Sequence, residues 1–106
     1  MADVAITALN TQLKKLGNAS SLHSAGRSVR KDLEGAREEI AKAIDCDASE
    51  VIFTATGTEA NNLAIKGLYW KGVKENKKVI ITSTFEHHAV MDPVTWLAEH
   101  EGAQIV

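Results

Sequence analysis

The sequence predicts an α/β fold in which helices flank a mostly parallel sheet. Three short apolar runs, at residues 51–54, 79–82 and 103–106, have the length and composition of buried strands. Before and between these runs, apolar residues recur at steps of three and four, which is the spacing of amphipathic helices. The predicted element order is therefore α-α-β-α-β-α-β, and strands that alternate with helices favour a three-layer arrangement.

Two helices are predicted ahead of the first strand. Residues 2–16 place apolar side chains on one face, and Gly17 and Asn18 end that helix. The second helix begins at Ser24, which is a suitable N-cap residue. Its apolar stripe, at steps of four, three, four and four, consists of Val29, Leu33, Ala36, Ile40 and Ile44.

The second half of the chain alternates between strands and helices. A helix is predicted from about residue 59 to 73, and residues 83–88 form the exit loop of the strand at 79–82. The next helix is expected to begin at Asp92-Pro93, because proline is tolerated in the first turn. Gly102 is expected to end this helix.

Length and composition limit the possible classes of protein. With 106 residues, 44% of them hydrophobic and 25% charged, the chain is expected to form a single globular domain with a modest core. A net charge of −2 gives no electrostatic reason to expect a nucleic acid or a membrane surface as partner. No signal peptide or membrane span is visible, and the single cysteine fits a reducing, cytoplasmic location.

The turn between the strand at 51–54 and the following helix has two interpretations. The first amides of a helix carry partial positive charge and no partner, Gly57 permits close approach, and the Thr56 and Thr58 hydroxyls can donate to phosphate oxygens. Alternatively, Thr56 caps the helix and Glu59 completes a capping box. The spacing alone favours the cap.

Three blocks of sequence point to a family. They are residues 53–62 (FTATGTEANN), residues 84–90 (TFEHHAV) and, upstream, residues 18–27 (NASSLHSAGR). In this order and spacing they resemble the cysteine desulfurases, which belong to the class V aminotransferase family of fold-type I pyridoxal-phosphate (PLP) enzymes. The resemblance implies that residues 1–106 are a single partial domain, from the PLP-binding large domain of an enzyme about four times as long.

The resemblance also implies roles for three residues. Gly57 and Thr58 match positions that bind the PLP phosphate, although Thr56 stands where relatives usually have glycine. His87 matches a histidine that stacks on the pyridine ring and performs acid–base work, which suits a side chain that changes protonation near neutral pH. Judged without the family, His87 is a surface loop histidine. No metal site is expected, because the adjacent side chains of His87 and His88 diverge.

The resemblance further implies a reaction in which L-cysteine is converted to L-alanine and its sulfur is transferred to an enzyme thiol. It also implies a homodimer that passes sulfur to an acceptor protein and serves iron–sulfur cluster assembly. The Schiff-base lysine and the sulfur-accepting cysteine are expected beyond Val106. Cys46 is not expected to be that nucleophile, because it precedes the phosphate turn and two aspartates oppose a thiolate. The alternatives are another class V enzyme (an aminotransferase or selenocysteine lyase) or a non-catalytic module.

Alone, the chain is expected to be inactive and either poorly stable or dimeric. In the resembled family, the strands that match residues 51–54 and 79–82 are separated by strands that come later in the sequence. Without those strands, apolar edges need another partner.

Overall fold

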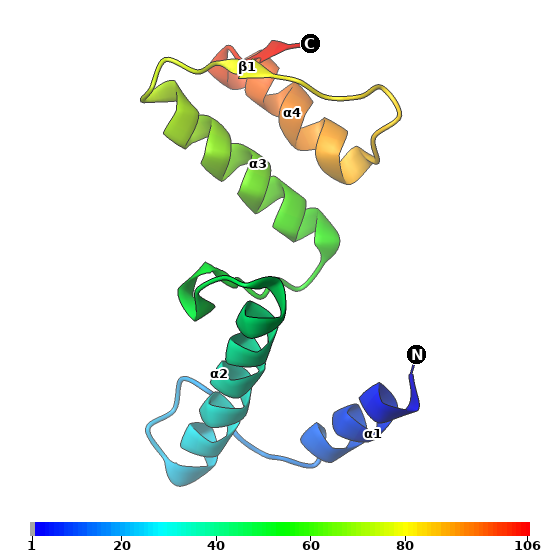
Figure 1. Ribbon diagram of the computed structural model, residues 1–106, viewed down its shortest axis with the longest axis vertical. Helices are drawn as coiled ribbons and strands as arrows, with labels where there is room; N and C mark the ends of the chain where they lie inside the picture. Colours follow the sequence, from blue (N-terminus) through cyan, green and yellow to red (C-terminus); the bar gives the residue numbers. More distant parts are fainter. Residues whose placement is uncertain (1) are drawn as a thin grey trace. The chain divides into compact units, whose positions relative to one another are not determined.

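A computed structural model of the chain describes residues 2–106. The chain divides into two compact units, Met1–Ile52 and Phe53–Val106. The part of the chain that the structure describes contains four α-helices, one short 3₁₀ helix and one two-stranded parallel sheet (Figure 1). The fold class is therefore α/β, as predicted. None of the described helices combines the length and the apolarity needed to cross a bilayer.

The first unit contains helix α1 (Asp3–Gln12), helix α2 (Ser24–Ile44) and the 3₁₀ helix η1 (Ala48–Glu50). Helix α1 ends earlier than the apolar spacing predicted. Helix α2 begins and ends as predicted, but its N-cap residue is His23, with Ser24 as the first helical residue. The loop at 18–22 packs closely on α2, since a Cβ on Gly26 would lie 2.5 Å from the carbonyl oxygen of Asn18. Only glycine fits that approach.

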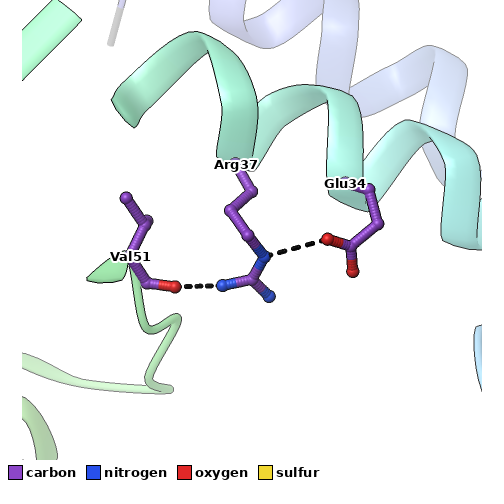
Figure 2. Close-up of polar contacts among 3 residues, drawn as sticks. All are labelled: Glu34, Arg37 and Val51. Carbon is purple, nitrogen blue, oxygen red and sulfur yellow. Dashed lines mark hydrogen bonds and ion pairs between the residues drawn. The ribbon is translucent and has the colours of Figure 1, made fainter. Parts of the chain in front are cut away.

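An arginine on α2 holds the chain that follows it. The Arg37 guanidinium donates through Nε to the Glu34 carboxylate at 3.1 Å and through Nη1 to the backbone carbonyl of Val51 (Figure 2). Glu50 and Asp47 close a capping box around η1. These contacts tie the end of the first unit back to α2.

The second unit contains helix α3 (Gly57–Val73), strand β1 (Val79–Ile80), helix α4 (His88–Glu101) and strand β2 (Gln104–Ile105). The strands are parallel, with Val79 opposite Gln104 and Ile80 opposite Ile105. Helices α3 and α4 pack side by side, and their N-terminal ends lie on the same side (Figure 1). Strand β1 leads into α4 through residues 81–87.

The core of this unit lies between α3, α4 and the sheet. Leu97, Tyr69 and Ala103 are buried together, with Ile65 and Ile80 packed against them. The Tyr69 hydroxyl donates to the backbone carbonyl of Glu101 at 3.0 Å, so the one polar atom of this side chain is satisfied where it enters the core.

Two predicted elements differ in the structure. Residues 51–54 are extended but are not assigned to a strand, so the strand predicted before α3 is wrong for this chain. A β-branched run becomes a strand only when another strand pairs with it, and local composition cannot supply that partner. The strands at 79–82 and 103–106 are confirmed but shorter, with two residues each.

The start of α4 is the other correction. The helix begins at His88, and Pro93 lies inside it and not at its first position. Ala89, Pro93 and Leu97 are all buried at steps of four, so one apolar face continues through the proline. The predicted end at Gly102 is confirmed, with the left-handed φ of 71° that glycine accepts readily.

Candidate functional site

The start of α3 is capped by two side chains, each of which accepts a hydrogen bond from a backbone N–H. The Thr56 hydroxyl accepts a hydrogen bond from the backbone N–H of Glu59 at 3.1 Å. The Glu59 carboxylate in turn accepts from the backbone N–H of Ala55 at 2.8 Å. Thr56 is therefore the helix cap. In a standard capping box the Glu59 carboxylate would accept from the backbone N–H of Thr56, the N-cap residue. Here it accepts from Ala55, one residue earlier.

This cap leaves the next two amides available. Among the described residues, no hydrogen bond engages the backbone N–H of Gly57 or of Thr58, and the Thr58 side chain is exposed. A Cβ built on Gly57 would meet nothing within 4 Å, so the space in front of the turn is open. The two interpretations of this turn are therefore compatible, because the cap uses Thr56 and leaves Gly57 and Thr58 for an anion.

The start of α4 is capped by a histidine. His87 has an extended backbone, and its ring nitrogen Nδ1 accepts a hydrogen bond from the backbone N–H of Ala89 at 3.0 Å. His88 is the first helical residue, and its Nδ1 lies 3.7 Å from the Asp92 carboxylate on the exposed side. The two imidazole rings are 6.3 Å apart and inclined at 72°, so one ring lies roughly edge-on to the other.

One cavity joins the two helix starts. Its volume is about 210 Å³, and its lining includes Thr58 from the first turn of α3 and His88 and Ala89 from the first turn of α4. The structure thus brings the predicted phosphate turn beside the segment that His87 begins. His87 immediately precedes the lining residues of α4, and its ring is exposed.

The sequence did not single out two side chains of this cavity. The Lys66 ammonium lies 4.0 Å from the centre of the Trp96 ring, and that ring stacks on His100 at 4.8 Å. Lys66 could have been found, because Thr58, Asn62 and Lys66 follow at steps of four and so share a helix face. Trp96 had no such signal, since its place depends on how α4 packs on α3.

His23 and the cysteine lie elsewhere in the chain. His23 caps α2 by its backbone, and Cys46 follows α2 in the first unit. The Cys46 side chain is half-buried, and its sulfur lies 3.5 Å from the backbone carbonyl of Asp47. The unit that contains Thr58 and His87 has no cysteine.

The family model of the class V aminotransferases matches residues 2–106. The chain belongs to this family. Among curated proteins it is similar to the IscS-like cysteine desulfurase of Mycobacterium tuberculosis, with 50% identity over 99% of this chain and 27% of the relative. The chain therefore spans about a quarter of the length of such relatives.

Solved structures of the family have the same local fold. A NifS-like protein superposes over 100% of this chain and 29% of its own, with a TM-score of 0.84 and 29% identity. A structure described as SspA in complex with cysteine superposes over 100% of this chain and 30% of its own, with a TM-score of 0.83 and 32% identity.

Proposed function

We propose that the chain is part of a PLP-dependent cysteine desulfurase, which converts L-cysteine to L-alanine and transfers the sulfur to an enzyme thiol. The observation that carries this proposal is the pair of helix starts, one with free amides and a threonine hydroxyl, the other with an exposed imidazole. When bound, PLP supplies the electron sink for bond breaking at the substrate amino acid.

The start of α3 fits the phosphate group. The free amides of Gly57 and Thr58 and the Thr58 hydroxyl can donate to phosphate oxygens, and the helix dipole favours the negative charge by about 0.3–1 kcal/mol. The Thr56 hydroxyl accepts the cap hydrogen bond from Glu59, and its own O–H can still donate. Threonine at a position where relatives have glycine is therefore compatible with phosphate binding.

The start of α4 fits the cofactor ring. The His87 imidazole is flat and exposed, and its backbone is fixed by the first turn of α4. In the proposed enzyme the His87 imidazole would lie against the pyridine ring and would perform acid–base work on the bound substrate. His88 lines the cavity beside Thr58, and its Nδ1 lies 3.7 Å from the Asp92 carboxylate.

The wider assignments follow from the family. The solved relative in complex with cysteine supports an L-cysteine substrate. We further propose a cytoplasmic homodimer that passes sulfur to an acceptor protein for iron–sulfur cluster assembly. In it, both units of this chain belong to one partial large domain with a three-layer, mostly parallel sheet. Another class V reaction, such as that of an aminotransferase or selenocysteine lyase, is the alternative.

The phosphate role is tested with Thr58→Val in the PLP-loaded protein, which keeps the shape of the side chain and removes its hydroxyl. PLP affinity should fall about tenfold, as for the loss of one hydrogen bond to a charged group, while the midpoint of thermal unfolding barely moves. Thr95→Val, on the exposed side of α4, is the matched control and should change neither. Lost stability with unchanged PLP affinity would make Thr58 a structural residue only.

The ring role is tested with His87→Ala. Alanine and sulfide production from L-cysteine should fall by a factor of about 10²–10⁴, while the cofactor absorbance shows that PLP is still bound. Unchanged turnover would exclude His87 from the chemistry. Transamination without sulfide release by the wild-type protein would favour the alternative class V reaction.

A further inference from the structure

His87 performs a structural task that constrains its chemistry. Its Nδ1 accepts the backbone N–H of Ala89 at 3.0 Å, and its carbonyl accepts from the backbone N–H of Val90 at 2.8 Å and of Met91 at 3.1 Å. Side chain and backbone together therefore satisfy three amides of the first turn of α4. Histidine is an unusual residue for this task, since the common N-caps are serine, threonine, aspartate and asparagine.

The hydrogen bond from Ala89 determines where the ring proton is. A backbone N–H always donates, so Nδ1 must present its lone pair, and the neutral imidazole then carries its only N–H at Nε2. Among the described residues, no hydrogen bond engages Nε2 of His87, so that N–H is available to a ligand. The cap thereby selects one of the two tautomers.

The same geometry limits proton uptake. The only lone pair of this tautomer is at Nδ1, which is occupied by the Ala89 amide. A proton gained there would oppose two N–H donors and break the cap. The titratable groups around this helix start are Glu86, His88, Asp92 and, from α3, Lys66. Among the described residues, none of them is hydrogen-bonded to the His87 ring.

We propose that the start of α4 holds His87 as the Nε2–H tautomer, so that His87 acts as a hydrogen-bond donor through Nε2 and accepts a proton only when the cap opens. The identity of the group that Nε2 binds, the substrate–cofactor adduct, is the one part of this proposal that rests on the proposed function. The tautomer and its link to the helix start stand without it. The acid–base role implied by the family resemblance is thereby restricted to the state in which Ala89 is released.

The tautomer is measured by NMR on the full-length protein with ¹⁵N-labelled histidine, in which the His87→Asn spectrum identifies the His87 signals. For the neutral ring, Nδ1 should give the resonance of an unprotonated nitrogen and Nε2 that of a protonated one, with and without PLP. The reverse assignment would overturn the proposal. Because this readout needs neither turnover nor cofactor, absence of desulfurase activity would count against the proposed function alone.

The cap is measured by hydrogen exchange of the Ala89 amide in matched variants. His87→Ala, which removes the acceptor, should speed exchange about fivefold, whereas His87→Asn, which restores a good N-cap, should stay within about twofold of the wild type. Both variants lack the imidazole, so both should lose turnover. Equal exchange in all three proteins would overturn the capping role.

Acidification tests the link between the cap and proton uptake. When NMR shows the His87 ring to be doubly protonated, the protection of the Ala89 amide in the wild type should fall to that of His87→Ala. The His87→Asn protein has no titrating cap, so its protection relative to an unstructured peptide should not change. Full protection of Ala89 beside a protonated wild-type ring would contradict the proposal.

Discussion

The two units of the chain differ in what their helices bury. In Phe53–Val106, the α4 residues Val94 and Leu97 are 1% and 0% exposed. In Met1–Ile52, α1 buries no residue, and α2 buries only Gly26 and Ala41. The apolar stripe predicted for α2 lies on one helix, but Ile44 is 66% exposed. Leu13, predicted for the α1 stripe, follows the last residue of α1 and is 71% exposed.

This difference shows that helical spacing and burial are separate properties. An apolar stripe specifies which face of a helix would be buried, but burial requires another element opposite that face. The second unit supplies that element, because α3, α4 and the sheet cover one another. The helix starts that carry Thr58 and His87 therefore rest on a packed core.

The largest effect should come from a cavity in that core. Leu97→Ala should lower the free energy of unfolding by about 2–5 kcal/mol, because the side chain is fully buried. Leu13→Ala, at the exposed C-terminal end of α1, should change it by less than about 0.5 kcal/mol. Urea unfolding followed by circular dichroism measures both. Equal losses would mean that the α1 stripe is covered, and the contrast between the units would fail.

Glycine substitutions should sharpen the contrast within the second unit. Gly102→Ala should destabilise by about 1 kcal/mol, because Gly102 has a φ of 71° at the end of α4. Gly67→Ala should stabilise by about 0.5–1 kcal/mol, because it lies inside α3 and an added Cβ would meet nothing within 4 Å. Thermal unfolding distinguishes the two signs. A stabilising Gly102→Ala would show that the left-handed cap is not maintained in solution.

The smallest effect should come from an ion pair in the first unit. The Lys15 ammonium is 2.5 Å from the Asp32 carboxylate, and this hydrogen bond lowers the pKa of Asp32. A lowered carboxyl pKa stabilises the folded state above the unfolded value and loses that contribution as pH falls through the folded value. Acidification below about pH 4 should therefore remove a small part of the stability.

Asp32→Asn and Lys15→Gln should each abolish this component, which melting curves between pH 3 and 6 would reveal. The double variant should lose no more than either single one, because both remove the same contact. An unchanged pH profile in Asp32→Asn would show that the pair contributes nothing. The effect should also shrink with added salt, since both side chains are partly exposed.

Local signals in the sequence predicted local structure well. The extent of α2, the cap at Thr56 and the end of α4 at Gly102 each depend on a few neighbouring residues, and all three are present in the structure. A parallel sheet was also predicted, because strands that alternate with helices favour it, and β1 and β2 are parallel.

Features that depend on distant partners were predicted less well. Residues 51–54 have the composition of a strand but not the pairing. The early start of α4 depends on the Nδ1 of His87, a cap that residue preferences do not favour. For the site, Gly57, Thr58 and His87 came from a family resemblance, whereas Lys66 and Trp96 emerged only when α3 and α4 were seen packed together.

The hydrogen bond from Tyr69 to Glu101 lies far from the cavity between the starts of α3 and α4, but it joins the same two helices. Tyr69 lies eleven residues beyond Thr58, which is about 16 Å along the axis of α3. This hydrogen bond joins the far end of α3 to the far end of α4 and, with the apolar core beside it, opposes sliding of one helix past the other. The Tyr69–Glu101 contact, at the C-terminal ends of α3 and α4, thus helps to keep the spacing between Thr58 and the first turn of α4 at their N-terminal ends.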